Sequence, residues 1–216
     1  MSTAAIELPL FPLDAVLFPG TALPLHIFEE RYRAMVADCI REEKPFGIVL
    51  VNAESEHLQE EPHAIGTMAV IRDVEELEDG RYNLIAIGTK RFRIVAQDRT
   101  RLYLSGEVEL FEDAKPEDAA QTAINQARTL FMRYLELLLD DEDAEAMEQS
   151  LPDEPEELSH FIAYFLDIGN EQKQSYLEMT STQQRLEAEV TILRREIPFM
   201  RKILEANLSN ERARLN

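Results

Sequence analysis

The residues best suited to hold a metal ion lie in one polar stretch, residues 52–63. It contains two histidines, His57 and His63, among four glutamates, Glu54, Glu56, Glu60 and Glu61. Imidazole and carboxylate groups bind zinc, but their spacing here matches no standard zinc pattern, and glutamates in a loop are usually only solvated. We therefore expect no bound metal and no cofactor.

Motifs for nucleotide hydrolysis and for common hydrolase chemistry are missing from the sequence. The tripeptide Gly88-Thr89-Lys90 lacks the earlier glycine and the phosphate-cradling loop of a P-loop. The patterns G-x-S-x-G, H-E-x-x-H and C-x-x-C do not occur. The single cysteine, Cys39, falls on an apolar helical stripe, which indicates a core position rather than a nucleophile. The residues therefore predict no catalytic site.

The charge balance of the 216-residue chain makes some classes of binding partner unfavourable. Twenty-two basic and 42 acidic residues give a net charge of −20, which repels nucleic-acid backbones and anionic membranes at long range. One cysteine excludes an internal disulfide framework and fits a reducing compartment. With no recognisable signal peptide and no run of 18 apolar residues, we expect a cytoplasmic protein that does not enter a membrane.

The first half of the chain has the pattern of short strands separated by turns. Six of the seven glycines lie at or before Gly106, and Asp79-Gly80 is a strong hairpin signal. An apolar stripe predicts one helix over 29–41. The predicted strands are 6–10, 23–28, 46–51, 67–74, 82–87, 92–95 and 102–111. Short strands with mixed spacing and little helix indicate a small, partly open barrel of about six strands.

The second half has the pattern of helices. Apolar residues recur every three or four positions, which predicts helices over 117–139, 156–168, 171–179 and from 182 onward. Between the first two, residues 136–157 carry 11 acids and no base, together with two prolines, so we expect a solvated connection there. A polar stretch around Pro116 predicts the boundary between a β-barrel subdomain, 1–116, and a helical bundle, 117–216. The fold class is therefore α+β.

A long motif near the N-terminus resembles the opening of the Lon protease N-terminal domain, the LON substrate-binding domain. Residues 9–20 read P-L-F-P-L-D-A-V-L-F-P-G, and residues 23–32 continue L-P-L-H-I-F-E-E-R-Y. Residues 88–94, G-T-K-R-F-R-I, are similar to a second family segment. Residues 173–178, K-Q-S-Y-L-E, followed by Arg185-Leu186, are similar to its helices. The resemblance covers about residues 6–204 and is strongest before residue 113.

The resemblance implies a specific fold and a binding function. The family fold is a PUA-like β pseudo-barrel joined to a helical bundle. In full-length Lon this domain precedes an ATPase module and a Ser-Lys peptidase module, and the motifs of both are missing here. We therefore expect a stand-alone, non-catalytic module that recognises unfolded or exposed polypeptide segments.

Several residues are candidates for contact with such a polypeptide. Exposed strand edges could add an extended peptide by backbone pairing. Aromatic side chains would supply apolar contact, and arginines would pair with acids; the candidates are Phe28, Arg31, Tyr32, His57, Arg91, Phe92 and Arg93.

Two other functions remain open at this point. PUA-like folds often bind RNA, and Arg91, Arg93, Arg99 and Arg101, with Phe92 and Tyr103, could form a basic and aromatic patch, although the net charge opposes it. Strand alternation would place Arg91 and Arg93 on one face and bury Phe92 on the other. The apolar seam from Leu186 to Leu204 could instead serve an adaptor or scaffold and pair with another chain, so we expect a monomer or a weak dimer.

Overall fold

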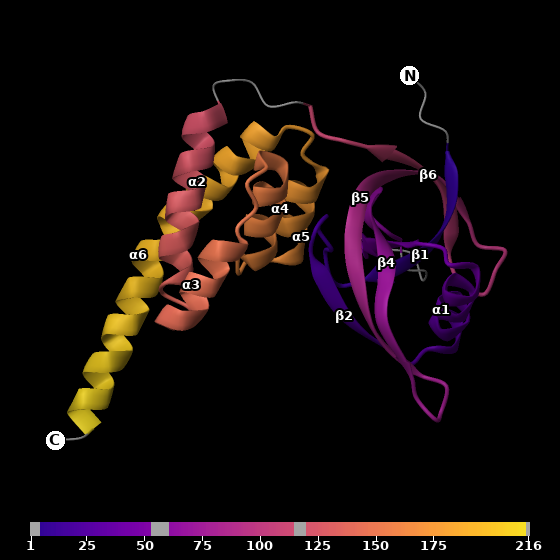
Figure 1. Ribbon diagram of the computed structural model, residues 1–216, viewed down its shortest axis with the longest axis horizontal. Coiled ribbons are helices and arrows are strands. Elements are labelled where there is room, and N and C mark those ends of the chain that lie inside the picture. Colours follow the sequence, from indigo (N-terminus) through magenta and orange to yellow (C-terminus); the bar gives the residue numbers. More distant parts are fainter. Residues whose placement is uncertain (1–4, 53–60, 115–119, 215–216) are drawn as a thin grey trace. The chain divides into compact units, whose positions relative to one another are not determined.

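The chain folds into two compact units in a computed structural model that describes residues 5–52, 61–114 and 120–214 (Figure 1). The first, here the β unit, comprises Met1–Asp113 and Ala163–Thr180; the second, here the helical unit, comprises Ala114–Ile162 and Ser181–Asn216. The predicted division at residue 116 places residues 163–180 with the helices, whereas the structure packs them with the strands. Residues 163–180 therefore belong to the β unit, although the sequence on either side of them belongs to the helical unit.

Six strands and one helix form the body of the β unit. The strands are β1 (Ile6–Leu13), β2 (Ala22–Ile27), β3 (Phe46–Leu50), β4 (Ile65–Glu76), β5 (Tyr82–Asp98) and β6 (Ser105–Phe111), and the helix is α1 (Glu30–Glu42). The prediction of about six strands and one helix in an α+β fold is confirmed. The two strands predicted at 82–87 and 92–95 are one continuous strand, β5. Gly88 lies inside it and makes no turn; it allows the Phe18 backbone to approach, because a Cβ there would lie 2.3 Å from the Phe18 carbonyl oxygen.

The strands close into a ring with one strand left outside it. The sheet order is β2-β5-β4-β3-β1-β6, and a further pairing of β5 with β6 joins β1, β3, β4, β5 and β6 into a barrel. The first part of β5 pairs with β2 from Ile87 to Tyr82, and the second part pairs with β6 from Arg91 to Asp98. Among the six strands of the described residues, β1 and β3 are the one parallel pair. Strand β2 therefore lies at an edge, paired with β5 alone within the described residues.

The barrel interior is filled by apolar side chains from every strand and from α1. One cluster centres on Phe11, Phe46 and Met35, and a second on Leu10, Phe92 and Val108. Gly66 lets neighbouring strands approach closely, because a Cβ there would lie 2.4 Å from the Ile48 carbonyl oxygen. On α1, Met35, Val36 and Cys39 of the predicted stripe are buried, and so is Tyr32. Ile40, which the prediction included in the stripe, is 39% exposed.

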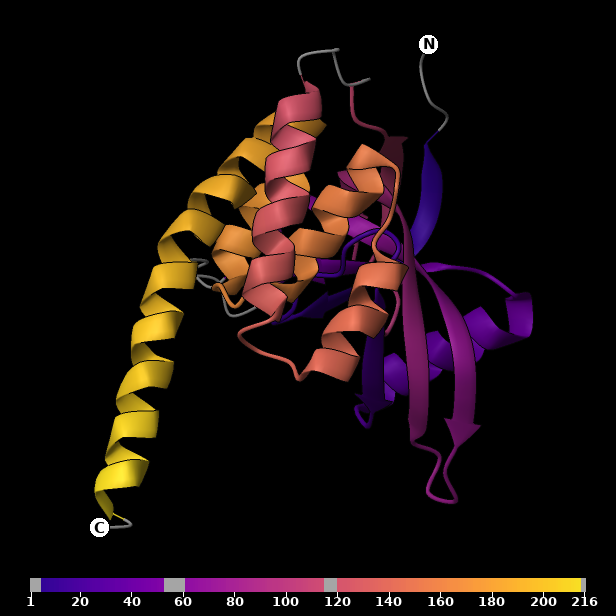
Figure 2. The same ribbon diagram turned by 60° about the vertical axis from the view of Figure 1, so that its left-hand side comes forward.

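The helical unit is built around two helices that lie side by side, α2 (Ala120–Leu135) and α6 (Thr182–Arg214) (Figures 1 and 2). Helix α4 (Pro155–Phe165) begins in this unit, and its last three residues belong to the β unit. Helix α5 (Asn170–Glu178) lies entirely in the β unit. Ser181 caps α6, since its Oγ accepts a hydrogen bond from the Gln184 N–H at 3.3 Å.

A short helix, α3 (Asp141–Ser150), occupies the acidic stretch for which we predicted only a connection. Asp140 caps it by accepting the Asp143 N–H at 2.9 Å, and three acids fill its first turn, where the helix dipole favours negative charge. Ala144 and Leu151 are buried and attach it to the unit. The prediction of a connection was wrong because the charge of the segment masked a capped helix with a narrow apolar side.

Candidate functional site

A hollow of about 230 Å³ opens where β1, β2 and the start of α1 meet in the β unit. Its wall includes the residues that link β2 to α1, so the contiguous motif from Leu25 to Tyr32 supplies most of it. The lining residues are Phe11, Pro12, Leu13, Leu25, His26, Ile27, Phe28, Glu29, Arg31 and Tyr32. Most of these lining residues are apolar, and the charged ones are Glu29 and Arg31.

Two buried aromatic rings form the floor of the hollow. The ring centroids of Phe11 and Tyr32 lie 4.2 Å apart with their planes tilted by 42°, and Phe46 lies 6.4 Å from Phe11 on the core side. Tilted contacts of this kind are favoured by the ring quadrupoles. The floor is therefore part of the barrel core and is held rigidly.

The rim of the hollow carries an exposed aromatic ring and an ion pair. Phe28 is 61% exposed. The Arg31 Nε donates a hydrogen bond to the Glu29 carboxylate at 2.9 Å, and its guanidinium lies 4.4 Å from the centre of the Tyr32 ring. Cation–π contact and ion pair together keep Arg31 at the mouth of the hollow.

A polar network fixes the orientation of His26 beside the hollow. Arg81 has only donors, so the His26 Nε2, 3.3 Å from Arg81 Nη1, must accept, and His26 Nδ1 therefore donates to the Asn83 Oδ1 at 2.7 Å. The Asn83 amide in turn donates to Glu75 at 3.2 Å. The ring of His26 lies 6.2 Å from that of Phe28, so the network also supports the exposed aromatic ring.

The open edge of β2 runs beside this hollow. The Ala22 carbonyl accepts a hydrogen bond from the Tyr164 hydroxyl at 3.1 Å, so the backbone groups of Ala22 point away from β5. Alternate residues of a strand direct their backbone groups to the same edge, which places Pro24 and His26 likewise. Proline lacks an N–H and fits only where no ladder bond is needed. The edge is therefore occupied by Tyr164 at Ala22, while at the exposed residues Pro24 and His26 no described strand pairs with it.

A second, larger hollow of about 670 Å³ lies along β2, β4 and β5. It is lined by Pro24, Leu25, His26, Asp73, Val74, Glu75, Asn83, Leu84 and Ile85. Val74 is 44% exposed, and Asp73 adopts a positive φ of 48° at a bulge that interrupts the pairing of β4 with β5. Leu25 and His26 line both hollows, so β2 separates them.

The structure divides the predicted contact residues into exposed and buried groups. Phe28 and Arg31 lie on the rim described above, and Tyr32 is buried in its floor. Arg93 is exposed on β5, with its guanidinium 5.9 Å from the Phe111 ring. Arg91 and Phe92 are buried, which removes them from the candidate surface, and His57 lies outside the described residues. The alternation that buries Phe92 is confirmed.

Arg91 has a structural role in the β unit. Its Nη1 donates to the carbonyls of Leu177 and Met179 at 2.8 and 2.6 Å, and its Nη2 pairs with the buried carboxylate of Asp113. Its guanidinium also lies 4.6 Å from the centre of the Phe111 ring. Carbonyls at the C-terminal end of a helix attract cations. Arg91 therefore attaches the end of α5 to the barrel.

The residues proposed for RNA contact do not form one basic and aromatic surface. Arg91, Phe92 and Tyr103 are buried. Arg99 pairs with Glu61 at 3.2 Å, and Arg101 pairs with Glu7 at 2.5 Å. The remaining exposed arginine, Arg93, does not by itself make a nucleic-acid site.

Neither the cysteine nor the carboxylates assemble into a reactive centre within the residues that the structure describes. Burial raises the pKa of the Cys39 thiol to about 11, so it stays protonated and unreactive at neutral pH. Across residues 5–52, 61–114 and 120–206, no group of three His, Cys, Asp or Glu side chains is placed to hold a metal ion.

The helices of the described chain are all too short or too polar to span a lipid bilayer.

Sequence reasoning missed the polar network and the second hollow. His26 and Asn83 are far apart in the chain, and only the pairing of β2 with β5 brings them together. Pro24 was a usable signal: a proline inside an otherwise regular strand indicates an open edge. Nothing in the local sequence indicates that this edge borders two hollows.

Comparison with known proteins gives a consistent result over most of the chain. Residues 7–195 match a family model described as the ATP-dependent protease La (LON) substrate-binding domain. A Lon protease of Anaeromyxobacter dehalogenans is 29% identical over 213 residues, and Lon protease 2 of Myxococcus xanthus is 30% identical over 213 residues. Each alignment covers 94% of this chain and 24% of the relative, so the chain spans about a quarter of their length.

Two solved structures share the fold. The crystal structure of a Lon N-terminal domain protein from Xanthomonas campestris has a TM-score of 0.65 at 28% identity, covering 86% of this chain and 98% of the other. The N-terminal domain of a Mycobacterium avium complex Lon protease has a TM-score of 0.70 at 19% identity, covering 87% and 98%, a likeness of fold alone.

Proposed function

Because the chain belongs to the LON substrate-binding domain family, we propose that its β unit binds extended segments of other polypeptides along the open edge of β2. The family supports a role in substrate recognition. The finer statement, that an extended segment lies on β2 with its side chains in the two hollows, is our proposal. In this reading the chain contributes binding and no chemistry of its own.

The observation that carries the proposal is the position of β2 between two hollows. A peptide that pairs with a strand edge alternates its side chains between the two faces of the sheet. Leu25 and Ile27 border the smaller hollow, while Pro24, Asn83 and Ile85 border the larger one. An added strand would therefore place successive side chains in different hollows while its backbone pairs with β2.

The size and lining of the smaller hollow indicate what enters it. At about 230 Å³ it is smaller than the pockets that enclose drug-sized ligands, which suits one apolar side chain rather than a cofactor. Phe28 and the aliphatic part of Arg31 would cover that side chain. We expect weak, sequence-tolerant binding, with a Kd in the micromolar range, because the contact area is small.

The proposal is tested by titrating a fluorescent, unstructured peptide with alternating leucine and polar residues into the protein and following its anisotropy. Removing Phe28 should weaken binding about five- to tenfold, since an exposed aromatic anchor contributes roughly 1 kcal/mol. The control is Leu102→Ala, because Leu102 is 76% exposed in the β unit and lines neither hollow. Equal affinities for Phe28→Ala and Leu102→Ala, or no saturable binding, would contradict the proposal.

A further inference from the structure

The end of α6 extends beyond the packed part of the helical unit. Ile197 is the last buried residue of this helix among those whose side chains are described, yet the helix continues to Arg214 (Figure 1). We call residues 198–214 the arm. On its described part, Phe199, Ile203 and Leu204 are 59%, 44% and 40% exposed. The apolar seam of α6 thus continues onto a stretch of helix whose described side chains are all exposed except the half-buried Met200.

The arm also differs in charge from the rest of the chain. Its sequence holds four basic and two acidic residues, against 18 basic and 40 acidic elsewhere. Arg201 and Lys202 are both exposed and lie on either side of the apolar stripe. A helix with exposed apolar residues bordered by cations fits an anionic surface that also offers apolar contact.

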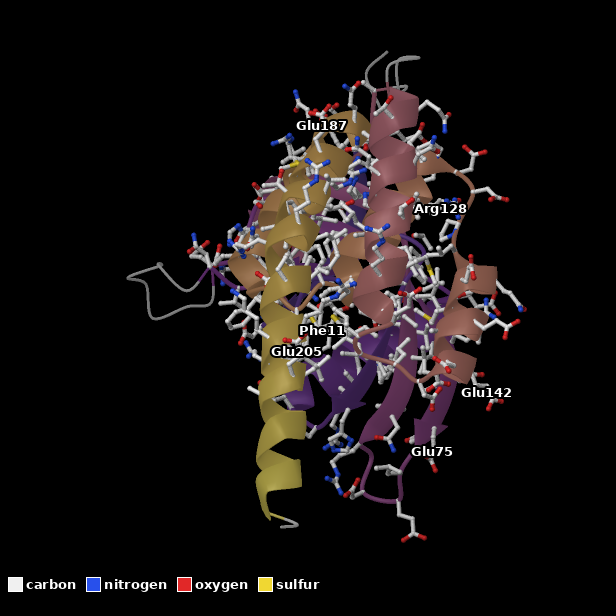
Figure 3. All side chains as sticks on the ribbon, turned by 90° about the vertical axis from the view of Figure 1, so that its left-hand side faces the viewer. Phe11, Glu75, Arg128, Glu142, Glu187 and Glu205 are labelled. Carbon is white, nitrogen blue, oxygen red and sulfur yellow. The ribbon has the colours of Figure 1, made fainter. Side chains whose placement is uncertain are left out.

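A surface of that kind occurs on the same molecule. Helix α3 and the turn before it carry exposed acids, among them Glu142, Glu145 and Glu148, and no base lies between residues 136 and 157. Glu142 points away from the helices in Figure 3, which also labels Glu205 on the arm. Leu138, in the turn after α2, is 52% exposed. We call α3 with this turn, residues 136–150, the acidic ridge.

Exposed apolar residues of the helical unit are confined to these two features. Among its described residues, the large exposed apolar side chains are Leu138 on the ridge and Phe199, Ile203 and Leu204 on the arm. Scattered single apolar residues are common on protein surfaces, but these four lie on only two features of the unit, the ridge and the arm. The arm and the ridge thus complement each other in charge and share apolar character.

We propose that the arm of one chain docks on the acidic ridge of a second copy, and that the second arm docks reciprocally on the first. A reciprocal contact closes under two-fold symmetry, so it gives a dimer rather than an open filament. Arg201 and Lys202 pair with acids of α3, while Phe199 and Ile203 cover Leu138. The interface is small, and the large net negative charge of each chain opposes association, so the dimer is weak.

Charge reversal tests the pairing with the full chain. In sedimentation velocity over a range of concentrations, the unaltered protein should show a concentration-dependent monomer–dimer equilibrium. The arm variant Arg201→Glu/Lys202→Glu and the ridge variant Glu145→Lys/Glu148→Lys should each weaken self-association about tenfold or more, because like charges then face each other. The ridge substitutions avoid the first turn and the cap of α3, and circular dichroism checks that both variants fold.

Mixing the two variants gives the decisive result. In the mixed dimer the acidic arm meets a basic ridge and the unaltered arm meets an unaltered ridge, so both contacts are restored and the dimer should return. A monomer at every concentration, or a dimer that either reversal leaves intact, would overturn the proposal. Failure of the mixture to dimerise would overturn the assignment of the ridge as the partner of the arm.

Discussion

Two buried charged residues show how strongly local surroundings decide the role of a side chain. Arg91 in the β unit meets a carboxylate and two carbonyls, so its charge is compensated. Glu189 in the helical unit is fully buried, and neither carboxylate oxygen has a hydrogen-bond partner. Arg185, one turn earlier on α6, donates its Nε to Ser159 at 2.8 Å. Burial therefore raises the pKa of Glu189 well above its usual value, although Arg185 opposes the shift.

We predict that Glu189→Gln makes the protein more stable at neutral pH and changes the pH dependence of unfolding. In the unfolded chain Glu189 loses its proton near the ordinary pKa of 4.5, while the folded chain keeps it to higher pH. The stabilising effect of the protonated carboxyl is complete below that value and is lost as the pH rises toward the raised folded-state pKa. At pH 7 the variant should gain about 1–3 kcal/mol, measured by urea unfolding.

Glu187→Gln is the matched control for this prediction. Glu187 lies on the same helix, exposed, and is labelled in Figure 3. Its replacement should leave the pH profile of unfolding close to that of the unaltered protein. A Glu189→Gln variant whose stability runs parallel to the unaltered protein from pH 4.5 to 8 would show that the buried carboxyl is not the cause.

At the scale of elements, the sequence predicts the strands and helices that have a clear local apolar pattern. It does not predict arrangements that depend on contacts between residues far apart in the chain. Alternating apolar residues locate the strands, and the spacing from Tyr32 to Cys39 locates α1. Helix α3 was missed because its only buried residue is Ala144, with Met147 half-buried and Leu151 buried just after the helix, among many acids. The return of α5 to the β unit could not be predicted, since it rests on contacts such as Gln174 with the Ile65 carbonyl, 109 residues away.

One part of the candidate site could be predicted from a local motif, and the other part depends on how the strands pair. Phe28, Arg31 and Tyr32 are adjacent in one motif, so the sequence could predict that they belong together. The rest of the site depends on register: Ile27 meets Tyr82, and His26 meets Asn83, only after β2 pairs with β5. Arg91 and Arg93 look equivalent in the sequence, and only the position of Asp113 and α5 makes one an anchor and leaves the other exposed.

Helix α5 should depend on Arg91 for its attachment. Replacing Arg91 with Gln removes the cation that faces the buried Asp113 carboxylate, and we expect a loss of about 3–5 kcal/mol in the free energy of unfolding. Arg93→Gln, two residues along the same strand, should have little effect because Arg93 is exposed. The double variant Arg91→Gln/Asp113→Asn should lose less than Arg91→Gln alone.

Urea unfolding of the three variants measures this dependence. Native-state hydrogen exchange of the α5 amides adds a local readout, because loosening of this helix should raise their exchange rates in Arg91→Gln before the barrel amides change. Equal losses of stability in Arg91→Gln and Arg93→Gln would contradict the assigned role.

Under the proposed function, the charge of the whole molecule should select among peptides. At a net charge of −20, the chain attracts cations over a distance set by the ionic strength. The proposed binding edge lies near Glu29, Asp73 and Glu75. Apolar segments flanked by basic residues should therefore associate faster than the same segments flanked by acidic residues.

We predict a roughly tenfold difference in affinity between a lysine-flanked and a glutamate-flanked version of one apolar peptide at low salt. The difference should shrink toward unity near 1 M salt, where the screening length falls to about 3 Å. Anisotropy titrations at several salt concentrations measure it. A preference that is independent of salt, or one for the acidic version, would show that the net charge does not act on binding.

The central claim, that a polypeptide adds to the open edge of β2, is tested most directly by residue-resolved hydrogen exchange with and without a saturating apolar peptide. The His26 amide points to the open edge, whereas the neighbouring Leu25 amide points to β5 and serves as an internal control. We predict that the peptide slows exchange at His26 at least tenfold and leaves Leu25 unchanged. Saturation of the protein with no protection at His26 would contradict pairing on β2.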